Sequence, residues 1–147
     1  MLKWLQKAFN KKARSSAEID DLGSFEFESG IGWRKTIRLD SFDVEIVIGS
    51  SGELPSQEMI ETARMWKSRW NALHQQAIEC IQRELATEVW ADEPDHPRGV
   101  ELTPQSIEIL WEHEPTNSMI FFQRLNDERA WHVTFRKEIP IGFAFDH

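Results

Sequence analysis

Hydrophobic and polar residues alternate in two blocks of the chain, and this alternation is typical of β-strands with one buried face. The first block holds the segments SFEFES, IGWRKTIRL and FDVEIVI, separated by short turn-forming links. The second block holds SIEILWEH, MIFFQRL, WHVTFR and IGFAFD. Strands with short links pair with their neighbours in the chain, so the pattern predicts antiparallel strands with one polar face.

Between the two blocks the spacing of apolar residues changes to steps of three and four, which is the helical period. The stripe consists of Met59, Ala63, Trp66, Trp70, Leu73, Ala77, Ile81 and Leu85. Ser56 is a suitable N-cap, and no Gly or Pro interrupts residues 56–86. The pattern therefore predicts one helix over 56–86. A straight helix of that length would span roughly 46 Å, so we expect a bend, an earlier end or a projection towards another subunit.

Together these segments predict an α+β fold with the order βββ-α-ββββ. A single antiparallel sheet of about seven strands would pack on one long helix. Residues 1–14 predict an extra amphipathic helix at the N-terminus, because apolar residues recur there at helical spacing. Residues 15–22 are expected to be a linker, and residues 23–147 to form one domain.

Charge is distributed unevenly along the chain. The 147 residues hold 17 Lys and Arg against 25 Asp and Glu, a net charge of −8. Residues 1–14 contain five of the bases and no acid, which leaves 12 bases and 25 acids, a net charge of −13, in residues 15–147. Such a body repels phosphate backbones, so no nucleic-acid partner is expected. It favours a basic protein partner, although acidic residues also serve solubility.

The N-terminal segment and one tryptophan are the candidate contact residues. The basic, amphipathic segment 1–14 can lie on an anionic membrane surface, dock on its own domain or fray. Trp90 lies outside every predicted stripe, so it either anchors a partner or folds back over the core. The candidate partner- or membrane-contact residues are Leu2, Trp4, Leu5, Lys7, Phe9 and Trp90.

Residues that could carry chemistry do not form a recognisable catalytic pattern. His132 falls on the polar side of its strand and could approach Asp146 or His147, but no nucleophile stands out nearby. The loop ADEPDHPRG offers Asp92 to His96 but lacks the spacing of a calcium or zinc site. The chain has no P-loop, GxGxxG or GxSxG motif. We therefore assign no catalytic, metal or cofactor-binding residue, and a small enzyme with a site around His132 is an alternative.

The chain composition favours the cytoplasm. A single cysteine, Cys80, excludes an intramolecular disulfide and suits a reducing compartment. No apolar run approaches the ~18–20 residues of a membrane span, and no secretory signal follows the basic N-terminus. We expect a cytoplasmic protein, peripheral to the inner membrane if residues 1–14 bind lipid.

The order LGSFEFESGIGWRKTIRL, VEIVI, LPSQEMIETARMWKSRW and WHVTFR resembles certain small bacterial domains of unknown function. Such domains are often placed among the immunity proteins of toxin systems. The resemblance covers residues 22–146 and rests on LG-x-F, a following Trp and the LPS-type helix start. It implies a non-enzymatic cytoplasmic binding protein. The group supplies no catalytic residues that could be assigned to this chain, and residues 1–14 lie outside the pattern.

Overall fold

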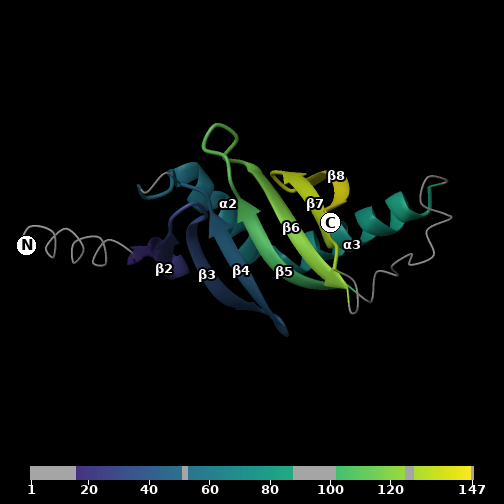
Figure 1. Ribbon diagram of the computed structural model, residues 1–147, viewed down its shortest axis with the longest axis horizontal. Helices are drawn as coiled ribbons and strands as arrows, with labels where there is room; N and C mark the ends of the chain where they lie inside the picture. The colour runs from purple at the N-terminus through teal and green to yellow at the C-terminus, as the bar shows by residue number, and fades with distance from the viewer. Residues whose placement is uncertain (1–15, 51–52, 88–101, 125–127, 147) are drawn as a thin grey trace, which may run out of the picture.

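The computed structural model describes residues 16–50, 53–87, 102–124 and 128–146. In these ranges eight strands form one mixed sheet in chain order, and two helices lie between β4 and β5 (Figure 1). The first four strands are β1 (Ser16–Ile19), β2 (Gly23–Glu28), β3 (Gly32–Leu39) and β4 (Phe42–Ile48). The last four are β5 (Leu102–Ile109), β6 (Asn117–Arg124), β7 (Ala130–Arg136) and β8 (Ile139–Asp146). The helices are α2 (Gln57–Ser68) and α3 (Trp70–Leu85), and a 3-10 turn, η1 (Asp20–Leu22), joins β1 to β2.

The predicted fold class, about seven antiparallel strands on one long helix with an extra N-terminal helix, is wrong. β4 and β5 pair in parallel, with Ile46 opposite Ile107 and Ile48 opposite Ile109, whereas the other neighbouring strands are antiparallel. The crossover explains the difference. The chain leaves β4 at one end, returns through the helices and enters β5 from the opposite end, so the two strands run the same way.

Two short helices replace the single helix predicted over residues 56–86. The break is at Arg69, whose backbone angles are φ −115° and ψ 21°. Its N–H still donates to the Met65 carbonyl (2.8 Å), and its own carbonyl accepts from the Leu73 N–H (3.0 Å). The start was predicted correctly, because the Ser56 hydroxyl accepts a hydrogen bond from the Met59 N–H (3.3 Å). A change of direction at Arg69 lets both helices stay on a twisted sheet, which one straight helix would leave.

The segment predicted as a linker is part of the sheet. Residues 16–19 form the edge strand β1, with Ser16 opposite Glu26, and Ile19 is buried. Arg64 of α2 holds the following turn by pairing with Asp20 and donating to Asp21 (2.7 Å). A short strand with one buried apolar residue gives too little alternation to be recognised. The helix predicted over residues 1–14 lies outside the described residues, as does Trp90.

Both helices cover the same face of the sheet, and the core lies between this face and the helices (Figure 1). One cluster joins Met59 and Ala63 of α2 to residues of β1 to β5, among them Phe25 and Trp33. The other cluster surrounds α3 and joins it to β3 to β7, with the partly buried phenylalanines of β8 against it. Cys80, also in this cluster, is buried, and burial raises the pKa of its thiol, as expected of a small core residue rather than a reactive one.

The stability of the fold is expected to depend on the protonation of His74. Its ring stacks on Trp70 (4.6 Å between ring centroids) and Phe122 (5.9 Å). Burial lowers the pKa of His74 below its ordinary value of 6.5, although Asp40 raises it slightly. The stability that the neutral ring contributes is therefore complete above pH 6.5 and is lost as the pH falls towards the folded-state pKa.

His74→Phe keeps an aromatic ring in the stack but removes the titrating group. Urea unfolding between about pH 5 and 8 should show a smaller loss of stability towards acid in this variant than in the native chain. An identical pH dependence in the two proteins would contradict the assignment.

Candidate functional site

The face of the sheet opposite the helices carries two rows of cross-strand neighbours. Side chains that face one another across paired strands lie on the same side of the sheet. The first row runs Glu26, Arg34, Val47, Glu108, Met119. The second row runs Thr36, Glu45, Ser106, Phe121, His132. We call the surface made by these ten residues and the flanking polar residues of β1 to β7 the open face.

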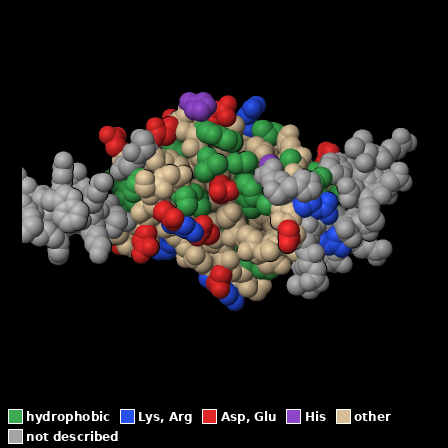
Figure 2. All heavy atoms as spheres, viewed as in Figure 1, with side chains coloured by type: hydrophobic (Ala, Val, Ile, Leu, Met, Phe, Trp, Pro, Cys, Tyr) green, Lys and Arg blue, Asp and Glu red, His purple; other side chains and the backbone are tan. Residues whose placement is uncertain are grey.

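Figure 2 shows the open face from the front. Hydrophobic side chains gather over its centre, with acidic side chains among them and a cluster of acidic and basic side chains over β3 and β4. The apolar floor is mostly shielded, since Val47 is 2% and Met119 9% exposed. Phe121 is half-buried and more accessible. The open face therefore combines an apolar floor with charged side chains that stand over it.

Acidic residues outnumber basic residues on the open face. The guanidinium of Arg34 pairs with Glu28 and with Glu45 (2.7 Å), and these hydrogen bonds raise the pKa of Arg34. Arg38 pairs with Asp43 (3.1 Å). The register places on this face the acids Glu18, Glu26, Glu28, Asp43, Glu45 and Glu108 against the bases Arg34, Arg38 and Arg136. The surface is therefore suited to a ligand that carries positive charge.

Glu108 is the most perturbed acid of the open face. It is half-buried in the middle of the first row. Burial raises the pKa of Glu108 above its ordinary value of 4.5, and the negative charge of Glu45 raises it further. The surroundings of Glu108 therefore disfavour the charged form of its carboxyl group, and a neighbouring cation would offset this.

Replacement of Glu108 by glutamine is expected to raise the free energy of unfolding at pH 7. Because the pKa of Glu108 is raised, its protonated form stabilises the folded chain below about pH 4.5. This stabilisation is lost as the pH rises through the folded-state pKa. The increase in the free energy of unfolding caused by Glu108→Gln should therefore become smaller as the pH falls from 7 towards 4.5. Urea unfolding at several pH values in this range measures it. Glu61→Gln, at an exposed position of α2, is the matched control and should change little. A variant less stable than the native chain at pH 7 would contradict this.

A shallow hollow of about 290 Å³ lies on the open face beside Glu108. We call it the open-face hollow. Its lining includes Phe121 and the two acids Glu108 and Glu128. One base, Arg129, also lines it, and the guanidinium of Arg129 lies over the Trp131 ring (4.7 Å to the centroid). An aromatic ring beside carboxylates is suited to a lysine or arginine side chain, whose stem packs on the ring while its charge meets the acids. Neither Glu108 nor Phe121 was singled out from the sequence. The β5–β6 register brings these two residues together, and the parallel β4–β5 pair places Glu45 beside them.

His132 lies on the open face, on the polar side of β7 as predicted. Its ring is 5.0 Å from that of Phe121, and Ala144 lies opposite it on β8. The register places the backbone of Asp146 opposite Ala130, whereas His147 lies outside the described residues. A catalytic role for His132, with a nearby carboxylate that orients its ring, stays a prediction.

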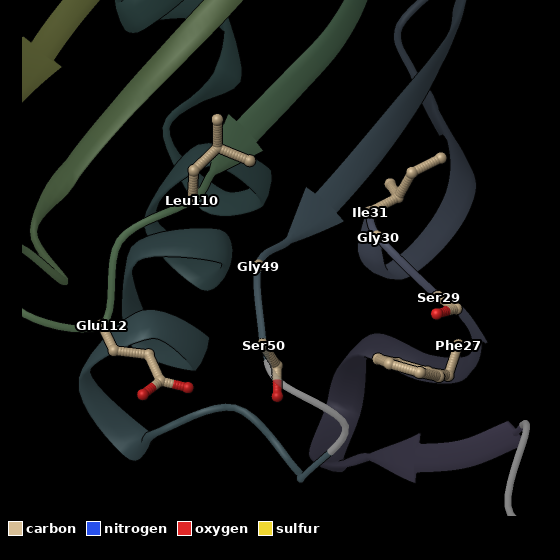
Figure 3. A pocket seen from close by; sticks show the side chains of 8 residues that line it. All are labelled: Phe27, Ser29, Gly30, Ile31, Gly49, Ser50, Leu110 and Glu112. Carbon is tan, nitrogen blue, oxygen red and sulfur yellow. The ribbon is translucent and has the colours of Figure 1, made fainter.

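A second hollow, of about 550 Å³, lies where β4 and β5 end. We call it the end hollow. In Figure 3, Gly49 and Ser50 lie in its middle, with Leu110 and Glu112 on one side and the β2–β3 turn on the other. The turn contributes Ser29, Gly30 and Ile31, and Phe27 of β2 completes the lining.

Two backbones approach closely at Gly49, in the lining of the end hollow. The Gly49 N–H donates to the Ile109 carbonyl (2.7 Å), and a Cβ at Gly49 would lie 2.4 Å from the Leu110 carbonyl oxygen. Clefts at the carboxyl ends of parallel strands are common ligand sites. An antiparallel sheet has no such place, so the sequence-based prediction missed this hollow.

The structure leaves all six predicted contact residues untested. Leu2, Trp4, Leu5, Lys7, Phe9 and Trp90 lie outside the described residues, as does the loop from Asp92 to His96. Among the described residues, no three His, Cys, Asp or Glu side chains are grouped in a way that could hold a metal ion. Neither α2 nor α3 has the length and apolar character that a membrane-crossing helix needs.

Comparison with known proteins assigns no family to the chain. No protein-family model matches it, and no curated protein or solved structure does so either. The resemblance to bacterial immunity-type domains therefore stays a prediction, and the function is argued from the geometry of the site.

Proposed function

We propose that the chain is a non-enzymatic protein-interaction domain that binds a basic segment of a partner protein on its open face. The observation that carries the proposal is the excess of acidic side chains around an apolar floor and an aromatic hollow. Polar sheet faces of this kind serve as contact surfaces for protein partners, and the charge selects partners of opposite sign.

The open-face hollow gives the proposed contact its specificity. A lysine or arginine of the partner would place its aliphatic stem on Phe121 and its charge beside Glu108 and Glu128. Since burial and Glu45 disfavour the charge of Glu108, an incoming cation gains more there than at a fully solvated carboxylate. Further bases of the partner would meet Glu45 and Glu26 along the two rows.

The proposed compartment is the cytoplasm, which the lone cysteine supports. An immunity protein that holds a basic toxin domain would be one form of this function, and the resemblance described above supports it. Membrane attachment through residues 1–14 is the other candidate, and the basic amphipathic pattern of that segment supports it.

A synthetic peptide can replace the unidentified partner. A fluorescent 12-residue peptide of alternating lysine and leucine is titrated with the full chain, and a peptide of alternating glutamate and leucine serves as the negative control. The basic peptide should bind, and its affinity should fall between about 0.01 M and 1 M salt as the Debye length shrinks from about 30 Å to 3 Å. The acidic peptide should not bind.

A pair of double variants locates the contact. Glu45→Gln/Glu108→Gln should weaken binding of the lysine–leucine peptide by about tenfold, equivalent to 1.4 kcal/mol. Glu58→Gln/Glu61→Gln removes the same charge from exposed positions of α2 and should change the affinity by less than about twofold. Equal weakening in both variants, or no binding at low salt, would contradict the proposal.

A further inference from the structure

The end hollow is bordered by apolar side chains exposed to solvent. Of the five large hydrophobic residues that are exposed in the described ranges, three come from segments next to the end hollow, whereas Ile139 and Ile141 lie on β8, several strands away. Ile31 (41% exposed) is in the β2–β3 turn, Leu54 (61%) follows β4, and Trp111 (38%) follows β5. With Phe27 and Leu110 in the lining, they make an apolar surface of the kind that marks a contact site.

The chain enters the sheet at the same end. β1 begins at Ser16 and runs antiparallel to β2, with Ser16 opposite Glu26. Residues that precede Ser16 therefore approach from the end where β2 turns into β3 and where β4 and β5 finish. Neighbouring strands are about 4.8 Å apart, so the ends of β4 and β5 lie roughly 14–19 Å from β1.

The segment before Ser16 has the length to cover this distance. At ~1.5 Å per residue in helical form, Phe9 would lie about 10 Å and Leu5 about 16 Å from Ser16. The apolar stripe Leu2, Leu5 and Phe9 thus falls at the distance of the end hollow. A more extended form would reach further.

The charges of the segment and of the end hollow are complementary. The described residues around the hollow, in ranges 29–31, 49–56 and 110–114, include Glu53, Glu112 and Glu114 and no lysine or arginine. Residues 1–14 hold Lys3, Lys7, Lys11, Lys12 and Arg14 and no acid. Attraction between them operates over a Debye length of about 8 Å at physiological salt.

We infer that residues 1–14 dock across the end hollow of their own chain. Leu5 and Phe9 pack against Ile31 and Leu110, and the lysines face Glu112 and Glu53. Covalent linkage favours this occupant, because a short tether holds the segment near the hollow at an effective concentration of the order of millimolar. Since the hollow and the open face are different surfaces, this inference stands or falls independently of the proposed function.

Paramagnetic relaxation in the full chain tests the docking. A nitroxide is attached at Gln6→Cys after Cys80→Ala removes the native thiol, and amide signals are compared before and after reduction of the label. Signals of Ser50, Leu110 and Glu112 should lose intensity, whereas Ala144 on the far edge strand should not. Leu5→Asp/Phe9→Asp should restore the signals of Leu110 and Glu112. Asn10→Asp/Ser15→Asp adds the same charge off the stripe and should leave the loss in place.

Two further measurements separate the other occupants. Isotope-labelled chain without a nitroxide is mixed with unlabelled chain that carries one, and loss of the Leu110 signal in this mixture would overturn the inference in favour of a second copy. Flotation with phosphatidylserine vesicles, combined with no loss at Leu110 in their absence, would overturn it in favour of a membrane. Equal loss in the stripe variant and its control would show that proximity alone causes it, which also overturns the inference.

Discussion

Replacement of Trp66 by alanine is expected to lower the free energy of unfolding by about 3–5 kcal/mol. Trp66 is completely buried in α2, and its ring packs on Phe135 of β7 (5.0 Å between centroids) and on Trp70 (6.4 Å). Its indole N–H donates to the Ser118 hydroxyl of β6 (2.8 Å). Alanine would leave a cavity between the helix and the sheet and would remove the partner of a buried hydroxyl.

Urea unfolding followed by far-ultraviolet circular dichroism measures this loss without depending on tryptophan fluorescence. Trp66→Phe should lose less, since a ring still fills most of the space while Ser118 loses its donor. Trp111→Ala removes the same side chain at a position that is 38% exposed and should cost about 1 kcal/mol or less. Equal losses at Trp66 and Trp111 would contradict the placement of α2 on the sheet.

Replacement of Gly49 by alanine is expected to cost about 1–3 kcal/mol, because a methyl group has no room there. The added Cβ would lie 2.4 Å from the Leu110 oxygen and 2.9 Å from its Cα, and backbone atoms cannot rotate away as a side chain can. The parallel ends of β4 and β5 would be forced apart at the end hollow. Nearby Leu110 and Glu112 should show the largest changes in amide chemical shift.

Gly142 in β8 provides the matched control. No atom lies within 4 Å of a Cβ built there. Gly142→Ala should therefore be neutral or stabilise the chain by about 0.4–1 kcal/mol through the unfolded state. Thermal unfolding of both variants decides the question, and a tolerated alanine at Gly49 would show that the two strands do not meet as described.

The alternation of hydrophobic and polar residues predicted strands correctly where one face is buried and the other is exposed to solvent. β3 and β7 are examples, since Ile37 and Val133 point to the core and Arg38 and His132 do not. The same reasoning missed β1, whose four residues contain one buried apolar side chain, Ile19. It also missed the break at Arg69, because neither Gly nor Pro marks it and the twist of the sheet imposes it.

The direction of β5 could not be predicted from its own residues. A strand shows the same alternation whether its neighbour is parallel or antiparallel, so the direction depends on how the crossover returns. The direction of β5 also determines which residues meet on the open face. Glu45 lies beside Ser106, and Val47 beside Glu108, only in the parallel register. The sequence could therefore predict a polar face but not the acidic, aromatic surface that forms on it.

Methyl NMR during titration with the lysine–leucine peptide tests the central claim most directly, because two matched pairs of methyl groups report on opposite faces of the sheet. Val47 and Met119 form the floor of the open face, whereas Val44 and Met59 lie in the core under the helices. Binding on the open face predicts that the methyl signals of Val47 and Met119 shift while those of Val44 and Met59 do not. Shifts at Val44 and Met59 alone, or at neither pair, would contradict it.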